Sequence, residues 1–517
     1  MNVDSFLTHH GLTENPFEAE EARHDPVYAR MIDNSTNHPD FGKILGQHEP
    51  PSTAIVFGEK GSGKTAIRLM ISRRVAAHNE SNPDRQMFLV VYDDLDPSLD
   101  RVVQWRRSRT GSDASVDQLL SGYRLEDHQD AILSLAVTQL VDLILTHKQE
   151  SNGQEKLRPP AMDQRLKSMP RRLRCDLAVL AALYDQPGSG PIVPRWRKLC
   201  SRLRVGRLGP VAALSYAATA ATVMTLGLLA GHWLSKAIGD SWPWFMPVTG
   251  VTLAASLVLW GLWLNRQGAA WLLSRRLQRE MPAVQRRVKA MMSMLLRFRR
   301  GDLERQSWPL ASADQQNRRY ELTGHLVEAL NAVGFSGLTV VIDRVDEPTL
   351  ISGKADRMRS LVWPMLDNKF LQQDRVGLKM LLPIELRYML YRESSDFFQG
   401  ARLDKQNLID RLSWSGATLY DMCSSRLRAC SDRHETQPIS LTDLFETDVT
   451  REMLIDALDQ MQQPRDAFKF LYNVIQEHCR ISPQDQLRFK IAQLTVDTVR
   501  RAQSQRVQEL QRGLAPA

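Results

Sequence analysis

The residues whose types and spacing best fit a known chemistry lie between 58 and 66. They follow a short β-branched apolar run at 54–57. Glycine, four residues, then Gly-Lys-Thr is typical of a loop whose backbone N–H groups cradle phosphates, when a strand precedes it and a helix follows. The predicted nucleotide-binding residues are Gly58, Glu59, Lys60, Gly61, Ser62, Gly63, Lys64, Thr65 and Ala66.

Each part of this loop has a predicted role. The glycines let the backbone curl around phosphate oxygens, and a helix starting near Lys64 directs its positive end at them. Lys64 is expected to reach the β- and γ-phosphates, and the Thr65 hydroxyl to bind Mg²⁺. Guanine recognition would require Asn-Lys-x-Asp, but the chain has only Asn368-Lys369-Phe-Leu. We therefore expect ATP and Mg²⁺ as ligands.

A second strand ending in aspartate is needed to hold the Mg²⁺. Two runs fit, 87–92 followed by Asp93, and 338–342 followed by Asp343. In the additional-strand class of P-loop NTPases, one extra strand separates the phosphate-loop strand from the metal-binding strand. The run at 87–92 comes directly after the loop's helix, so it is the natural extra strand. Asp343 is therefore the predicted metal carboxylate.

Hydrolysis also needs a carboxylate to polarise the attacking water. Its usual place is directly after the metal aspartate, where this chain has Arg344. The nearest substitutes are Asp346 and Glu347, and we favour Glu347 as the base. Arg344 in this position leaves the rate of hydrolysis open, whereas nucleotide binding is still expected.

Two segments are predicted to cross a membrane. Residues 208–234 contain no charged residue except a possible charge on His232, and residues 241–264 contain none. Each exceeds the roughly 20 apolar residues that span the hydrocarbon layer. Buried core helices rarely remain uncharged over such a length. With no hydrophobic signal region at 1–17, we expect entry through this internal hairpin.

The positive charge gathers beside these segments. Residues 192–209 carry +6 and residues 266–300 carry +9, whereas the whole chain carries +8. The positive-inside rule then places both flanks and both termini in the cytoplasm, with only about 235–240 on the far side of the inner (cytoplasmic) membrane. Anionic lipid headgroups are the expected partners of the flanks. Nucleic acid is not an expected partner, because the remaining residues sum to a negative charge.

This layout resembles the KAP family of membrane-anchored P-loop NTPases, in the STAND/AAA-like group. The matching pieces are 58–65, the two spans and 340–348, with Arg344 departing from the family's pattern. The segment 463–468 looks like the second-sensor turn of a helical lid, which implies that Arg465 reaches the γ-phosphate. The resemblance implies a nucleotide state that controls assembly or partner binding. It leaves open whether the partner is a second copy of the chain or another protein.

The expected fold is an α/β P-loop NTPase with a parallel sheet flanked by helices, interrupted by a two-helix transmembrane hairpin and followed by a C-terminal helical domain. The expected boundaries are a lead-in at 1–52, a first nucleotide-domain half with helical insertions at 53–200, the hairpin at 208–264, a basic juxtamembrane helix or stalk at 265–310, a second half at 319–436 and a helical lid and tail at 437–517.

The expected function is a slow ATPase that acts as a switch. The alternative is an ATP-binding membrane scaffold that hydrolyses little, which the departure at Arg344 keeps open. A transporter is disfavoured, because the interior of the two spans carries no ionisable residue of the kind that a transport path needs.

Overall fold

The computed structural model describes residues 1–19, 21–32, 38–110, 114–146, 158–188, 190–205, 210–238, 245–284, 286–298, 315–432, 439–482 and 488–511. They form two compact units. The first contains 1–82, 91–94 and 337–517, and the second contains 83–90 and 95–336. The end of the predicted far-side loop and residues 285 and 299–310 of the predicted stalk lie outside the described residues.

The sheet has five strands in the order β2-β3-β4-β1-β5. Its strands are β1 (Ala54–Gly58), β2 (Gln86–Tyr92), β3 (Phe335–Ile342), β4 (Val376–Pro383) and β5 (Asn407–Ile409). The pairings of β1 with β4, β1 with β5 and β3 with β4 are parallel. The chain passes from one unit to the other within β2 and near the start of β3, so the carboxyl ends of both strands belong to the first unit.

The strands at 54–57, 87–92, 338–342 and 377–382 were predictable because parallel strands are covered on both faces and read as continuous apolar runs. Every residue of β1 and β4 is buried. In the sheet, β4 lies between β1 and β3, so β4 separates the strand before the glycine-rich loop from the strand that ends at Ile342. The run at 87–92, expected as the separating strand, lies instead at the edge of the sheet beside β3. The carboxyl ends of these strands meet at one edge.

The first unit also contains helices that surround the sheet and form the C-terminal part of the chain. Those before and beside the sheet are α1 (Val3–His9), α2 (Pro26–Met31), α3 (Phe41–Leu45), α4 (Lys64–Ser81), α16 (Ala355–Val362), α17 (Asn368–Leu371), α18 (Ile384–Leu390) and α19 (Ser395–Ala401). The C-terminal ones are α20 (Gly416–Ala429), α21 (Arg451–Asp459), α22 (Pro464–Ile481) and α23 (Gln493–Gln511), and short 3₁₀ turns occupy Trp363–Met365, Leu403–Lys405 and Leu441–Leu444.

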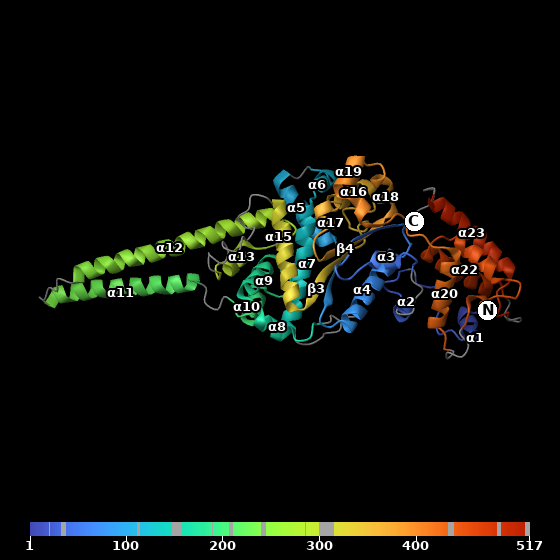
Figure 1. The fold of residues 1–517 in the computed structure, drawn as a ribbon, viewed down its shortest axis with the longest axis horizontal. Coiled ribbons are helices and arrows are strands. Elements are labelled where there is room, and N and C mark those ends of the chain that lie inside the picture. The colour runs from blue at the N-terminus through green and yellow to red at the C-terminus, as the bar shows by residue number, and fades with distance from the viewer. Residues whose placement is uncertain are drawn as a thin grey trace. The chain divides into compact units, whose positions relative to one another are not determined.

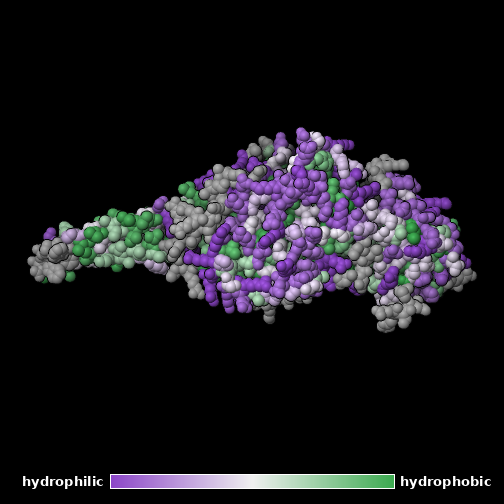
Figure 2. All heavy atoms as spheres, viewed as in Figure 1, coloured by the Kyte–Doolittle hydropathy of each residue, from purple (hydrophilic) through white to green (hydrophobic). Residues whose placement is uncertain are grey.

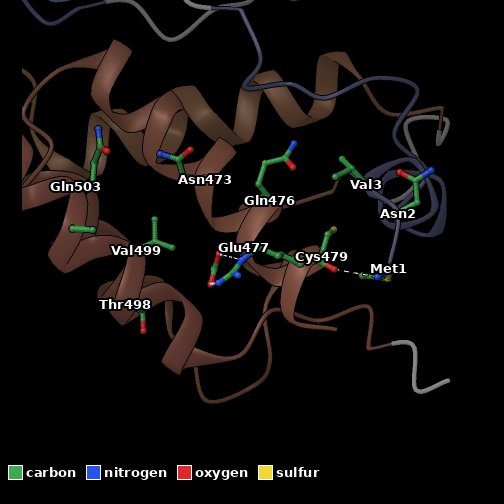
Figure 3. Close-up of a pocket in the computed structure, with 12 residues that line it drawn as sticks. Met1, Asn2, Val3, Asn473, Gln476, Glu477, Cys479, Thr498, Val499 and Gln503 are labelled. Atoms are coloured by element: carbon green, nitrogen blue, oxygen red, sulfur yellow. Dashed lines mark hydrogen bonds and ion pairs between the residues drawn. The ribbon is translucent and has the colours of Figure 1, made fainter. Parts of the chain in front are cut away.

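The first residues of the chain pack against the C-terminal helices. The Met1 amino group donates hydrogen bonds to the carbonyls of Cys479 (3.0 Å) and Ser482 (2.9 Å) at the end of α22. Residues of α22 and α23 line a hollow beside this contact (Figure 3). The N-terminal segment, predicted as a lead-in, is therefore part of the folded first unit.

The second unit is helical apart from the starts of β2 and β3. Its helices are α5 (Asp96–Thr110), α6 (Val116–Ser121), α7 (Leu125–Leu145), α8 (Met162–Ser168), α9 (Arg171–Tyr184), α10 (Ile192–Leu203), α11 (Pro210–Ile238), α12 (Phe245–Glu280), α13 (Val288–Leu295) and α15 (Gln315–Val333). The segment predicted as the first nucleotide-domain half, 53–200, is thus divided between the units. The reason is packing, because α7, α9 and α15 bury their apolar faces against one another.

The helices α11 and α12 lie side by side as an antiparallel hairpin (Figure 1). Both are long and apolar enough to cross a membrane, and only 17% and 11% of their most apolar windows are buried. A core helix of a soluble protein would be mostly buried, whereas here the apolar residues form an exposed surface (Figure 2). Small and polar residues make the contact between the two helices: Thr222 Oγ1 lies 2.8 Å from Ser256 Oγ and accepts from Trp260 Nε1 at 3.0 Å.

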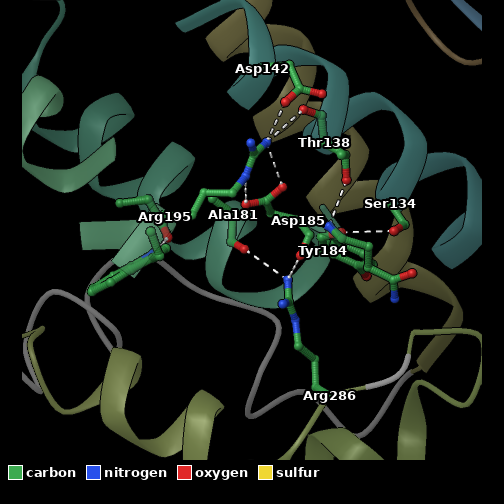
Figure 4. A network of polar contacts seen from close by, with 11 residues as sticks. Ser134, Thr138, Asp142, Ala181, Tyr184, Asp185, Arg195 and Arg286 are labelled. Atoms are coloured by element: carbon green, nitrogen blue, oxygen red, sulfur yellow. Dashed lines mark hydrogen bonds and ion pairs between the residues drawn. The ribbon is translucent and has the colours of Figure 1, made fainter. Parts of the chain in front are cut away.

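The segment 265–310, predicted as a basic juxtamembrane helix or stalk, contains more than one helix among its described residues. The helix α12 ends at Glu280, and α13 starts only at Val288. Between them, the buried Arg286 donates to the carbonyls of Ala181 (3.2 Å), Leu183 (3.1 Å) and Asp185 (Figure 4). The Ala181 carbonyl also accepts the Asp185 N–H at 3.1 Å, whereas the Leu183 and Asp185 carbonyls lie at and just after the end of α9. The C-terminus of a helix carries partial negative charge, so a cation is favourable there. Burial lowers the pKa of Arg286 to about 10, so it is still charged at neutral pH.

The first basic flank also contributes to this interior. Arg195 of α10 lies 2.9 Å from both the Asp185 and the Asp142 carboxylates (Figure 4). Arg195 and Arg286 therefore fix the helices of the second unit to one another. Their charges are unavailable for lipid headgroups, so the part of the flanks that can attract lipid is smaller than the sequence alone implied.

Candidate functional site

The glycine-rich loop joins β1 to α4 within the first unit. Gly61 and Gly63 have φ angles of +94° and +93°, which side chains rarely adopt. A Cβ atom on Gly61 would lie 3.0 Å from both Arg465 Cβ and Gln463 Oε1. Gly63 also precedes the first residue of α4, so the helix N-terminus opens toward the loop. Local conformation thus explains the glycines at these two positions.

Lys64 folds back onto the loop. Its Nζ donates to the carbonyls of Gly58 (2.8 Å) and Glu59 (2.9 Å). Burial lowers the pKa of Lys64, and nearby carboxylates, Asp346 and Asp343 foremost, oppose that shift. The ammonium group is therefore held at the carboxyl edge of the sheet by carbonyls and carboxylates that surround it.

Other parts of the first unit fix the loop from outside. Glu59 forms an ion pair with Arg411 at 2.6 Å and accepts a hydrogen bond from Gln463. Trp414 Nε1 donates to the Ser62 carbonyl at 2.9 Å. Neither Glu59 nor Ser62 lines the cavity described below, so among the predicted binding residues these two serve to shape the loop.

The end of β3 brings an acid to the start of α4. Thr65 Oγ1 donates to Asp343 Oδ2 at 3.3 Å, and Asp343 is 1% exposed. Burial raises the pKa of Asp343, while Arg68 and Lys64 act in the opposite direction. The structure thus brings together the two residues predicted to bind Mg²⁺, although they are 278 residues apart in the chain.

The second candidate acid lies at the same edge. The Asp343 N–H donates to the Tyr92 carbonyl at 3.3 Å, which places the end of β2 beside the end of β3. Arg68 of α4 bridges the two acids: its Nη1 lies 3.2 Å from Asp93 Oδ2 and its Nε lies 3.3 Å from Asp343 Oδ2. Of the two acids, Asp343 is the one bonded to Thr65.

The acids after Asp343 have different surroundings. Glu347 forms an ion pair with Arg344, and its side chain is 49% exposed. Arg344 has a φ of +61°, which lets the chain turn at the strand end. Asp346 is half-buried and is first among the charges that raise the pKa of Lys64. Both predicted bases line the cavity, but Asp346 is the one that acts most strongly on Lys64.

These groups open into a cavity of about 620 Å³ within the first unit. That volume is in the usual range for small-molecule sites. The predicted site residues that line it are Lys60, Gly61, Gly63, Lys64, Thr65, Ala66, Asp343, Asp346, Glu347 and Arg465. The predicted residues Gly58, Glu59 and Ser62 do not line the cavity, and neither do Asn368 and Lys369.

Arg465 lies at the first turn of α22, directly over the loop. Its backbone N–H donates to the Gly61 carbonyl at 3.4 Å. Its side-chain Nε is buried and has no hydrogen-bond partner among the described residues. A guanidinium group in this state is available to an anion at the cavity wall.

The far side of the cavity is built from residues for which the loop motif gave no signal. Tyr28 of α2 donates to the Ala66 carbonyl at 2.8 Å, and burial raises its pKa. Arg426 of α20 pairs with Asp25 at 2.5 Å and lies 4.5 Å from the centre of the Phe468 ring. Aromatic, methionine and ion-pair side chains thus face the loop across the cavity.

Sequence reasoning missed Arg68, Tyr28 and the buried Asp25–Arg426 pair. Arg68 is one helical turn after Lys64, so its position could have been read as facing the same edge. Asp25 and Arg426 are 401 residues apart, and no local pattern links them.

No protein-family model, no curated protein and no solved structure matches this chain. The site therefore stands on its own geometry: a glycine-rich loop at a helix N-terminus, a lysine and a threonine after it, and a buried aspartate beside the threonine.

Proposed function

We propose that this chain is a membrane-anchored P-loop ATPase whose nucleotide state controls assembly or partner binding. The observation that carries the proposal is the contact of Thr65 with Asp343, made across a sheet in which β4 separates β1 from β3. That order is what the additional-strand class requires of the loop strand and the metal strand. The same features support a place for the chain in the KAP family.

The cavity residues fit magnesium and a polyphosphate. Thr65 and Asp343 offer two adjacent oxygen ligands, and Mg²⁺ usually takes one or two protein ligands and completes its octahedron with phosphate oxygens and water. Among the described residues no group of three or more His, Cys, Asp or Glu side chains could hold a metal by itself. A bound Mg²⁺ would neutralise charge on the phosphates, which P-loop enzymes require.

The chain's own residues would do the remaining work. The N–H groups of 60–66 and the Lys64 ammonium would bind the β- and γ-phosphates, and Arg465 would approach the terminal phosphate from α22. Asp346 would accept the proton of the attacking water, and Glu347 would serve only if it left Arg344. The side chains of Tyr28, Met70 and Phe468 would enclose the adenine ring of the nucleotide.

The exposed apolar hairpin of α11 and α12 supports the membrane anchor. The proposal places both termini in the cytoplasm and the short connector of the hairpin across the inner membrane, because the basic residues flank the hairpin at its open end.

A second candidate is an ATP-binding scaffold that hydrolyses little. The Arg344–Glu347 pair favours it, because the position after the metal aspartate carries a cation that holds the nearby glutamate away. Both candidates predict ATP binding, and only turnover separates them.

The test uses the full chain in uncharged detergent, with ATP affinity and phosphate release measured in parallel. Lys64→Ala should lose ATP binding, whereas Lys369→Ala, outside the cavity, should keep it. Mg²⁺-dependent release that disappears with Lys64→Ala supports the ATPase. Binding without release in the parent protein supports the scaffold, and no ATP binding at all contradicts both.

A further inference from the structure

The second unit contains a cavity of about 730 Å³ rich in arginine. Seven arginines line it against three acids, an excess of four positive charges. They come from α5, from the start of α7, from the end of α12 and from α15. The arginines are Arg106, Arg109, Arg124, Arg275, Arg276, Arg279 and Arg319.

Three of these arginines already have acidic partners. Arg106 lies 3.5 Å from Asp127, Arg276 lies 2.8 Å from Glu280, and Arg319 lies 3.0 Å from the buried Asp130. These pairs fix the walls of the cavity.

The other four have no carboxylate partner among the described residues: Arg109, Arg124, Arg275 and Arg279. Two of them lie over indole rings, Arg109 at 4.1 Å from the centre of Trp105 and Arg275 at 5.1 Å from that of Trp271. Stacking holds a guanidinium plane in place and leaves its N–H groups free to bind an anion. Unpaired arginines that converge from separate helices are a typical means of binding phosphate.

The hairpin's register shows how deep this cavity lies. Ser256 and Trp260 of α12 both contact the Thr222 hydroxyl of α11, so Thr222 is level with the turn 256–260 of α12. Eleven residues toward the start of α11 is Val211, and eleven residues further along α12 is the turn 267–271, so Val211 is level with that turn, which ends at Trp271. Val211 begins the apolar part of α11, and Trp271 is 42% exposed, as an interfacial tryptophan would be.

Arg275 follows at the depth of lipid headgroups, and Arg279 lies just beyond that layer. At a rise of 1.5 Å per residue they lie about 6 and 12 Å beyond Trp271 along the axis of α12. The polar layer of a leaflet is about 5–8 Å thick beyond the hydrocarbon. The cavity therefore starts within the headgroup layer and extends just below it.

We propose that this arginine-lined cavity binds the phosphate-bearing headgroup of an anionic phospholipid. The inference rests on the proposed membrane insertion of α11 and α12 and is independent of nucleotide binding in the first unit. Three observations favour this ligand. The cavity has an excess of positive charge, four of its arginines have no carboxylate partner among the described residues, and it starts at the depth of the headgroup layer. The volume admits a headgroup with two phosphates, such as that of cardiolipin.

The test compares two variants of equal charge in the full chain, purified in uncharged detergent. Arg109→Gln/Arg275→Gln removes one stacked arginine from each of two helices of the cavity. Arg107→Gln/Arg287→Gln removes two arginines that do not line it. Cardiolipin in mixed micelles is the probe, with phosphatidylcholine as the neutral lipid and pyrophosphate as a soluble competitor.

The cavity variant should bind cardiolipin about tenfold to thirtyfold more weakly, at roughly 1 kcal/mol for each cation near the membrane surface, and the control should change less than twofold. An equal loss of cardiolipin affinity in both variants would contradict a specific site and indicate a diffuse electrostatic attraction. If pyrophosphate bound as tightly as cardiolipin, the ligand would be a soluble polyanion.

Two further readouts separate this inference from the proposed function. Recovery of the chain in the soluble fraction without detergent would overturn the lipid assignment, because the hairpin would not be inserted. ATP affinity of the cavity variant should equal that of the parent, because none of its substituted residues lines the cavity at the glycine-rich loop. A loss of lipid binding alone then supports the site, whatever the outcome of the ATPase test.

Discussion

Arg68 and Asp343 form an ion pair in which Arg68 Nε lies 3.3 Å from Asp343 Oδ2, the oxygen that also lies 3.3 Å from the Thr65 hydroxyl. The guanidinium group thus contacts the same carboxylate oxygen that the proposed Mg²⁺ would use. It also reaches Asp93, so one cation of α4 connects the ends of β2 and β3.

This relationship predicts that Arg68 competes with Mg²⁺. Arg68→Gln should lower the Mg²⁺ concentration needed for half-maximal ATP binding by about fivefold to thirtyfold at pH 8, because the cation that is ion-paired with Asp343, worth roughly 1–2 kcal/mol, is removed. Arg68→Lys keeps the charge and should change it less than threefold. A titration of Mg²⁺ against a fluorescent ATP analogue measures both. An unchanged or weaker Mg²⁺ dependence in Arg68→Gln would show that the pair is only structural.

The two aspartates that Arg68 joins should differ in function. Asp343→Ala should abolish Mg²⁺-dependent ATP hydrolysis, because Asp343 alone of the two lies against Thr65. Asp93→Ala should keep most of the turnover. Phosphate release from well-folded variants decides this, with circular dichroism as the control for folding. Loss of turnover in Asp93→Ala alone would reverse the assignment.

The two acids after Asp343, Asp346 and Glu347, should differ in their effect on ATP turnover. Asp346→Asn should lower turnover about 10²- to 10⁴-fold while ATP affinity stays close to that of the parent, since general-base assistance is lost and the phosphate contacts are kept. Glu347→Gln should lower it less than tenfold, because Glu347 is paired with Arg344 and half exposed. If only Glu347→Gln traps ATP, the sequence-based preference for Glu347 is correct and the ion pair opens during turnover. If neither affects turnover, no base lies in this segment.

The arginine-lined cavity should respond to pH through Asp127. Burial raises the pKa of Asp127 to about 6, whereas a hydrogen bond from the Arg124 backbone N–H lowers it. The charges that act on Asp127 are Asp130 and Glu126 on its own helix and Arg106 on α5. Below pH 6 the carboxyl group is neutral, so it no longer repels a phosphate and no longer holds Arg106. Cardiolipin should therefore bind several-fold more tightly at pH 5.5 than at pH 7.5. Asp127→Asn should bind tightly at both values, and a pH effect of equal size in that variant would contradict this cause.

Topology can be tested with single cysteines, because all five native cysteines are buried. Lys236→Cys, at the exposed end of α11, should react with a membrane-impermeant maleimide added to intact cells. Lys198→Cys, in the first basic flank, should react only after the membrane is opened. Labelling of both from outside, or the reverse pattern, would overturn the proposed orientation.

The sequence by itself was sufficient for features that depend on neighbours along the chain. Gly61 and Gly63 indicated a loop whose backbone curls tightly, and both residues have positive φ angles. The apolar runs at 54–57 and 338–342 predicted buried parallel strands. The two uncharged segments likewise indicated helices long enough for a membrane, because length and the absence of charge are local properties. The choice of Asp343 rested on strand order, which is also read along the chain.

Tertiary structure alone decided what distant residues do to one another. Arg286 looked like one more basic residue of a stalk, but it is buried against the last carbonyls of α9, about a hundred residues earlier. In the sequence, Arg344 stands where the catalytic carboxylate is usual, and Glu347 is a substitute for that carboxylate. The turn at the end of β3 pairs the two side chains with each other. The second unit's cavity assembles arginines from four helices. Charge and hydrophobicity are visible in a sequence, but the partner of a charge depends on which helices pack together, and packing is set by the whole core.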